Sequence, residues 1–83
     1  MNKVLVEVFL PAAAQRFDMF IPLDSQMGEV TALAAQLLET LSRGKFSAND
    51  TSALCDAHTG EMYDINMYAA DLGLQNGSRL LLI

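Results

Sequence analysis

The stretch from Met27 to Leu41 constrains the fold of this chain more than any other segment. Its apolar residues recur every three or four positions, which is the spacing of one face of an α-helix: Met27, Val30, Leu33, Ala34, Leu37, Leu38 and Leu41. Asp24 or Ser25 is suited to cap the N-terminus of this helix, and Gly44 follows its C-terminus. We therefore predict one amphipathic helix, whose apolar face must be covered by the rest of an 83-residue chain.

The segment before the predicted helix has the pattern of two strands. Residues Lys3–Leu10 are rich in valine and alternate imperfectly in polarity, as a strand does. Pro11 ends that strand, because proline has no backbone N–H to donate to a sheet. A short alanine-rich loop leads into Gln15–Leu23, which reads as the returning strand. We predict an antiparallel hairpin.

Three shorter strands are predicted after the helix. Ala53–Ala57 is the third strand, and a turn at His58–Gly60 leads into a brief fourth strand at Glu61–Tyr63. Met67–Leu74 contains one turn of helix, and an Asn-Gly turn precedes the closing strand at Ser78–Ile83.

The closing strand is apolar on both faces, with Leu80 and Leu82 on one side and Leu81 and Ile83 on the other. A strand of this kind usually lies in the middle of a sheet, between two neighbours. The predicted fold class is therefore α+β: a mixed five-stranded sheet packed on one long helix, with a short 3-10 or helical turn.

The residues from Asp71 to Ile83 carry a resemblance to a known family. They can be laid on the last turn and the last strand of ubiquitin without a gap. Pro22, Met27 and Val30 match the loop and the first helical turn of ubiquitin. This resemblance in pattern implies a ubiquitin-like β-grasp fold, as a single domain over residues 1–83.

A narrower resemblance rests on the turn and strand Asn76-Gly77-Ser78-Arg79-Leu80 and on the opening strand Val4–Val8. Both are similar to those of the YukD/EsaB-like group of bacterial ubiquitin-like proteins. The resemblance implies a cytoplasmic accessory of type VII (WXG-type) secretion. It also leaves open a ubiquitin-like cytosolic domain of a larger secretion membrane protein.

Ubiquitin, its conjugated relatives and the sulfur carriers of the same fold end in Gly-Gly, whereas this sequence stops at Ile83. We therefore expect neither conjugation nor sulfur transfer. The alternative is a ubiquitin-type modifier or sulfur carrier whose C-terminal Gly-Gly is missing from this sequence, and the codons after Ile83 would distinguish the two.

Charge and hydropathy limit the possible partners. Ten acidic and five basic residues give a net charge of −5, which disfavours nucleic acid and anionic membrane surfaces as partners. No apolar run approaches the roughly 18 residues that span a bilayer, so we expect no direct membrane insertion and a soluble, cytoplasmic protein.

The sequence offers little for catalysis. Cys55 is the only cysteine and His58 the only histidine, and neither has neighbours that would make it a nucleophile, a general base or a metal ligand. We predict no catalytic residue, no cofactor and no metal site, hence a binding protein and not an enzyme.

The predicted protein-binding residues follow from the two-sided closing strand. If Leu80 and Leu82 face the helix, Leu81 and Ile83 lie on the helix-free face of the sheet, where Leu5 joins them and Cys55 borders them. In ubiquitin the corresponding face binds most partners. We expect a protein partner or a second copy of the chain to dock there, with Leu5, Cys55, Leu81 and Ile83 in the contact. The alternative is an ordinary central strand with some exposed leucine.

Overall fold

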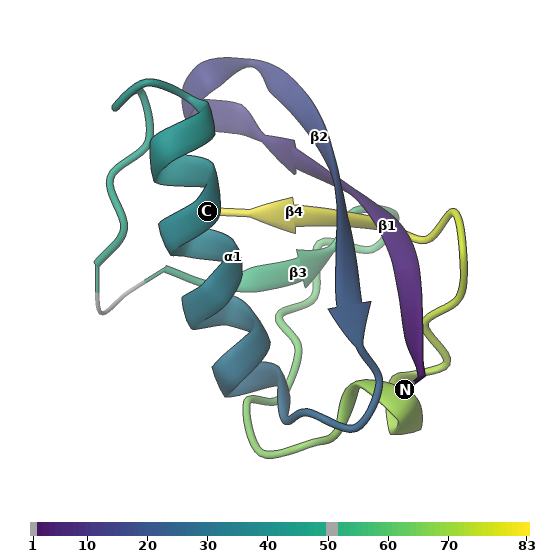
Figure 1. Cartoon of the computed structure of the whole chain (residues 1–83). Coiled ribbons are helices and arrows are strands. Elements are labelled where there is room, and N and C mark those ends of the chain that lie inside the picture. Colours follow the sequence, from purple (N-terminus) through teal and green to yellow (C-terminus); the bar gives the residue numbers. More distant parts are fainter. Residues whose placement is uncertain (1, 50–51) are drawn as a thin grey trace.

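The computed structural model describes residues 2–49 and 52–83, and it consists of one long helix lying across one face of a mixed sheet (Figure 1). The strands are β1 (Lys3–Leu10), β2 (Gln15–Pro22), β3 (Leu54–Asp56) and β4 (Arg79–Leu82), in the spatial order β2-β1-β4-β3. β1 is antiparallel to β2 and parallel to β4, and β3 is antiparallel to β4. The prediction that the closing strand is central is therefore confirmed.

The hairpin and the helix lie where the sequence predicts them. β1 has the predicted bounds, and β2 ends one residue earlier than predicted. A 3-10 turn, η1 (Pro11–Ala13), joins them, and Ala14 closes it in the left-handed conformation with φ 52°. α1 spans Met27–Leu41, as predicted, and a second 3-10 turn, η2 (Ala69–Leu72), falls inside the predicted helical segment. Within the described residues no helix is long and apolar enough to cross a membrane.

The core forms where the alternate residues of β1 and β4 meet α1. Val6, Val8, Leu80 and Leu82 are at most 1% exposed, because the central strands are covered by the helix on this face. The other buried apolar residues are Val4, Leu10, Ile21, Met27, Val30, Ala34, Ala35, Leu38, Phe46, Leu54, Cys55 and Ala69. Burial of large apolar side chains stabilises the fold by about 1.5–3 kcal/mol each before the ordering cost of the chain is counted.

The predicted fifth strand is absent from the described part of the chain, which has a four-stranded sheet. The segment predicted as Glu61–Tyr63 is reduced to an isolated bridge between Met62 and Cys55. The pairing stops there because the chain turns away at Asp64, whose side chain accepts from the backbone N–H of Asn66. That turn carries the following backbone to the N-terminus of α1.

The predicted N-terminal cap of the helix is also wrong, whereas Gly44 follows the C-terminus in the left-handed conformation with φ 81°. Neither Asp24 nor Ser25 is the N-cap; Gln26 occupies that position and makes no side-chain cap hydrogen bond. Instead, the N–H of Met27 donates to the carbonyl of Met67 at 2.8 Å, and the N–H of Gly28 donates to that of Ile65 at 2.9 Å. Distant backbone carbonyls thus satisfy the helix N–H groups that a capping side chain usually takes.

The buried face of α1 differs in part from the predicted apolar stripe. Leu33, Leu37 and Leu41 are 56%, 42% and 47% exposed, whereas Ala35 is buried. The segment after the helix covers the Ala35 flank, where the N–H of Ala48 donates to the Glu39 carboxylate at 2.6 Å. The three leucines lie on the opposite flank of the helix, toward the edge strand β2.

Candidate protein-binding face

One face of the sheet is not covered by the helix, and we refer to it as the helix-free face. Strand alternation places on it the residues whose neighbours along the chain are in the core. They are Lys3, Leu5, Glu7 and Phe9 of β1, Arg16, Asp18 and Phe20 of β2, Cys55 of β3, and Arg79 and Leu81 of β4.

The structure brings Leu81 next to Phe9 and not next to Leu5. Phe9 is the register partner of Leu81, whereas Leu5 lies four residues earlier on β1, about 13 Å away along the strand. Ile83 continues the same side, because its backbone exchanges two hydrogen bonds with Ala53 beyond the end of β4. Ile83 is 55% exposed. Phe9, Leu81 and Ile83 therefore form the apolar patch at one end of the face.

Leu5 belongs to a separate cluster at the other end of the face. It is the register partner of Phe20 on β2, and the ammonium of Lys3 lies 4.5 Å from the centroid of the Phe20 ring. The side chain of Asn76 holds the backbone here, since its Oδ1 accepts from the N–H of Leu5 at 2.8 Å. The four residues predicted to bind a partner are thus divided between two places.

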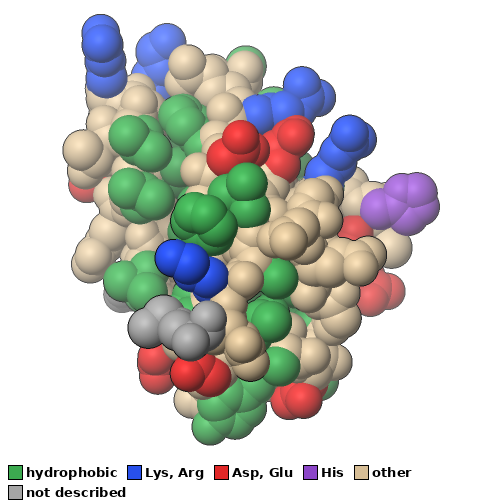
Figure 2. Space-filling view, turned by 45° about the vertical axis from the view of Figure 1, so that its right-hand side comes forward, with side chains coloured by type: hydrophobic (Ala, Val, Ile, Leu, Met, Phe, Trp, Pro, Cys, Tyr) green, Lys and Arg blue, Asp and Glu red, His purple; other side chains and the backbone are tan. Residues whose placement is uncertain are grey.

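A charged band separates the two apolar clusters. Glu7 lies opposite Asp18 on one side and opposite Arg79 on the other, and Arg16 is bonded to Glu7 with 3.1 Å between Nε and Oε1. Figure 2 shows acidic and basic side chains gathered side by side, with hydrophobic side chains below them. Arg16 and Glu7 make the one ion pair found within residues 2–49 and 52–83, so Arg79 has no acidic partner there.

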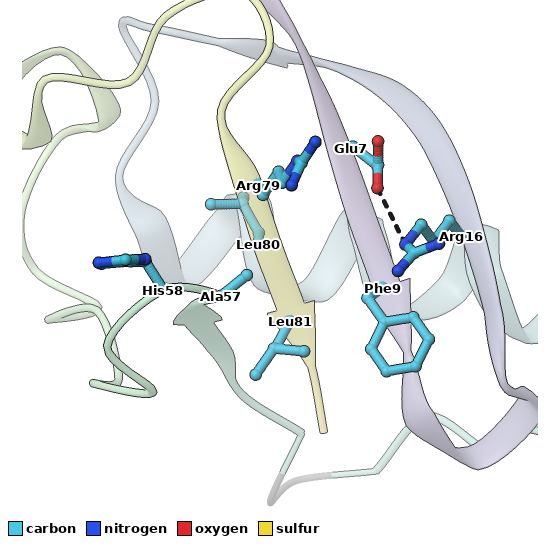
Figure 3. Close-up of a pocket in the computed structure, with 8 residues that line it drawn as sticks. All are labelled: Glu7, Phe9, Arg16, Ala57, His58, Arg79, Leu80 and Leu81. Carbon is cyan, nitrogen blue, oxygen red and sulfur yellow. Dashed lines mark ion pairs between the residues drawn. The ribbon is translucent and has the colours of Figure 1, made fainter.

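A shallow hollow lies between this band and the apolar patch (Figure 3). The Phe9 ring and the Leu81 side chain are among the residues that line it, and the Arg16 guanidinium is 5.5 Å from the Phe9 ring centroid, within range of a cation–π contact. Its volume of about 280 Å³ is below the range of roughly 300–1,000 Å³ typical of small-molecule pockets. The remaining residues around it are Glu7, Ala57, His58, Arg79 and Leu80.

Cys55 contributes little surface to the face. It pairs with Leu81 across β3 and β4 and is bridged to Met62, which leaves it 2% exposed. Burial raises the pKa of its thiol, so the reactive thiolate is disfavoured. The pKa of Tyr63 is raised to about 12, mainly because burial disfavours its charged form and to a smaller extent because Asp56 and Cys55 are nearby.

His58 is exposed in a turn that the Asp56 carboxylate organises. Oδ1 of Asp56 accepts from the backbone N–H of His58 at 2.7 Å and from that of Thr59 at 3.2 Å. Within the part of the chain that the structure describes, no group of three or more His, Cys, Asp or Glu side chains could hold a metal ion.

The predicted binding residues did not include Phe9, Arg79 and Phe20, which the structure places on this face. The signal was present in the strand alternation, because Phe9 has the same parity as Leu5 on β1 and therefore shares its face. What the sequence does not contain is the register between β1 and β4, which decides that Phe9 is the neighbour of Leu81.

Comparison with known proteins identifies the fold. Neither a protein-family model nor a curated protein sequence matches this chain. Among solved structures, the chain superposes over its full length on the EccD5 ubiquitin-like domain from Mycobacterium xenopi, with a TM-score of 0.83 at 15% identity, and covers 94% of that domain. The fold is ubiquitin-like.

Two further structures share this ubiquitin-like fold. The ubiquitin-like domain of the Mycobacterium tuberculosis type VII secretion system protein ECCD1 gives a TM-score of 0.80 at 15% identity, with 100% of this chain and 99% of that domain covered. A chain of the MycP5-free ESX-5 inner membrane complex gives 0.83 at 16% identity, and this chain covers 21% of it. Identities at this level establish the fold alone.

Proposed function

We propose that this ubiquitin-like chain is a non-catalytic protein-binding module of bacterial type VII secretion, acting as one domain in the cytoplasm. The observation that carries the proposal is the apolar patch of half-buried Phe9 and Leu81 and exposed Ile83 beside Arg79, a cation without an ion-pair partner among the described residues. The similarity to the ubiquitin-like domains of ECCD1 and EccD5 supports the secretion context.

The chemistry of the face suggests what the partner presents. An apolar side chain of the partner would sit in the hollow over Phe9 and Leu81, and a carboxylate would pair with Arg79. Arg16 is already engaged by Glu7 and supplies the wall of the hollow. We therefore favour a partner protein over a second copy, since two copies would each bring a net charge of −5 to the contact.

Binding, and not catalysis, also agrees with the state of the reactive side chains. The Cys55 thiol is buried with a raised pKa, and the backbone around exposed His58 is organised into a turn by Asp56. Neither arrangement activates a nucleophile or a general base.

The proposal is tested with the purified cytosolic parts of the membrane proteins of the host's type VII secretion system, titrated one by one by calorimetry. Ile83→Glu and Arg79→Glu should each weaken binding of the true partner by about 10–100-fold, because each change affects one interface side chain. The matched control is Ile65→Glu, since Ile65 is similarly exposed at 61% and lies beside the N-terminus of α1, away from this face.

Two outcomes would reject the docking face. One is that no component of the secretion system binds. The other is that a component binds the folded Ile83→Glu variant as tightly as it binds the original chain. If the chain instead associates with itself through this face, the partner is a second copy of the chain and not another protein.

A second candidate is that the chain is the ubiquitin-like cytosolic domain of a longer secretion membrane protein. It is favoured by the match to a chain of the ESX-5 inner membrane complex, of which this chain covers 21%. Sequencing the gene beyond the codon of Ile83 tests it: a long apolar continuation supports this candidate, and a stop codon rejects it.

A further inference from the structure

A second hollow lies on the flank of α1 opposite its exposed leucines. Gly28, Ala32 and Ala35 line it from the helix, and Ile65 lines it from the segment that precedes η2. The remaining residues around it are Thr31, Asn49 and Ser52. Its volume is about 290 Å³, and its lining along the helix extends for about 10 Å. The hollow is therefore a short groove along the helix, and we call it the α1 groove.

The backbone around Ile65 is fixed to the start of α1 (Figure 1). The carbonyl of Ile65 accepts from the N–H of Gly28 at 2.9 Å, and the carbonyl of Met67 accepts from the N–H of Met27 at 2.8 Å. A Cβ atom at residue 28 would lie 3.3 Å from the Ile65 carbonyl oxygen, so a glycine there lets the two segments approach this closely. The wall of the groove is thus in place before a partner binds, which lowers the ordering cost of binding.

The side chain of Ile65 is apolar without serving the core. It is 61% exposed, and Met67 on the same segment is also exposed. Among the described residues, neither belongs to the buried core cluster or to the apolar side chains that pack against it. Exposed apolar side chains beside a groove are typical of interaction sites.

The groove is acidic at the end where α1 begins. Glu29 and Asp64 are exposed there, next to Gly28 and Ile65 in the sequence. Neither carboxylate has an ion-pair partner within residues 2–49 and 52–83. The sequence also has no Lys or Arg from residue 46 to residue 78. A partner with basic residues would complement this end of the groove.

The shape of the groove fits a helix better than a strand. An added strand needs free backbone N–H and C=O groups along an edge. One wall of the groove is α1, whose backbone groups bond within the helix, and at the other wall the Ile65 carbonyl is already bonded to Gly28. A helix needs no such groups, and small residues such as Ala32 and Ala35 let it approach α1 closely.

The charges also give the direction of a bound helix. Arg43 and Lys45 follow Glu39 beyond the far end of the groove, so basic residues of a partner belong at the end near Glu29 and Asp64. Cations stabilise a helix most in its last turn. A partner helix with its last turn beside Glu29 would run antiparallel to α1.

We propose that a helix of a partner protein packs into the α1 groove, with an apolar stripe against Ile65 and Ala32 and with Lys or Arg in its last turn beside Glu29 and Asp64. A second copy of the chain fits less well, because it carries a net charge of −5. An anionic membrane surface is repelled for the same reason. The groove is distinct from the helix-free face, and this proposal does not rest on the function proposed for that face.

The probe is a synthetic peptide of about 18 residues, since shorter helices are marginal in water. Leucine and alanine recur on one side of it at helical spacing, and lysines occupy its last turns. The control peptide has glutamate in place of each lysine. The amide signals of Ala32, Ala35 and Ile65 in the labelled protein should shift when the lysine peptide is added. By calorimetry, the glutamate peptide should bind at least about tenfold more weakly.

Matched variants test the groove itself. Ala32→Arg places a bulky cation in the groove and should weaken binding of the lysine peptide by at least about tenfold, whereas Leu33→Arg places the same residue on the other flank and should change it by less than about twofold. Ile65→Lys should also weaken binding by at least about tenfold, and Ile65→Leu should preserve it. Circular dichroism of each variant confirms that it is folded.

The proposal is overturned if the lysine peptide does not bind, if it binds without shifting those three signals, or if it binds folded Ala32→Arg as tightly as the original chain. Self-association through Ile65, or sedimentation with phosphatidylcholine vesicles that Ile65→Lys abolishes, would assign the groove to a second copy or a membrane and would also overturn it. Ile83→Glu should leave peptide binding unchanged, and Ala32→Arg should leave binding at the helix-free face unchanged. Failure of one proposal is therefore distinguishable from failure of the other.

Discussion

Alanine substitutions at two adjacent residues of β4 test which face of the sheet the helix covers. Leu80 is fully buried between the sheet and α1, whereas Leu81 is half-buried on the helix-free face. Leu80→Ala removes buried atoms and leaves a cavity, so we expect it to lower the free energy of unfolding by about 3 kcal/mol. Leu81→Ala creates no enclosed cavity and should cost roughly 1 kcal/mol.

Thermal unfolding followed by circular dichroism measures the difference. For a domain of 83 residues, each kcal/mol shifts Tm by about 4–8 °C, so we expect decreases of about 12–24 °C for Leu80→Ala and about 4–8 °C for Leu81→Ala. Urea unfolding of the same variants checks that the transition keeps its steepness. Equal decreases would mean that Leu81 is covered as fully as Leu80, and a larger decrease for Leu81→Ala would mean that the face taken as helix-free is the covered one. Either result would contradict the docking proposal.

Two further predictions concern titratable groups: the buried Cys55 and the half-buried Tyr63. The Cys55 thiol should react with an alkylating reagent at least about tenfold more slowly in the native protein than in urea, because it is buried and its pKa is raised; equal rates would show that β3 does not shield it. Tyr63 has a pKa raised from 10.0 to about 12, so its contribution to stability is complete below pH 10 and is lost as the pH rises toward 12, since the unfolded chain ionises first. Tyr63→Phe should remove this part of the alkaline loss of stability, and an unchanged pH profile in that variant would contradict the assignment.

The sequence predicts which face of the sheet the candidate site occupies, but it does not predict which residues lie next to one another there. Strand alternation predicts that Leu81 and Ile83 face away from the helix, and the structure agrees. It cannot predict that Leu5 is distant from them, because that depends on the register between two strands separated by about 70 residues of chain. Nor could it predict the burial of Cys55, which follows from its pairing with Leu81 and its bridge to Met62.

The sequence by itself determined the elements that depend on local periodicity. The spacing of apolar residues predicts α1 from Met27 to Leu41, and the alternation ended by Pro11 predicts β1. The two-sided apolar character of residues 80–83 predicts a central closing strand. These features are encoded within a few residues of one another, so no knowledge of distant contacts is needed to infer them.

Only the tertiary structure decided which apolar residues are left uncovered. Seven positions of α1 have helical spacing, yet the sheet and the segment after the helix leave Leu33, Leu37 and Leu41 exposed beside the open edge of β2. The carbonyls of Ile65 and Met67, and not a local side chain, accept hydrogen bonds from the first N–H groups of the helix. Because the chain turns toward the helix there, the predicted fourth strand is reduced to an isolated bridge. Contacts between distant segments compete with local preference, and their outcome depends on how the whole chain packs.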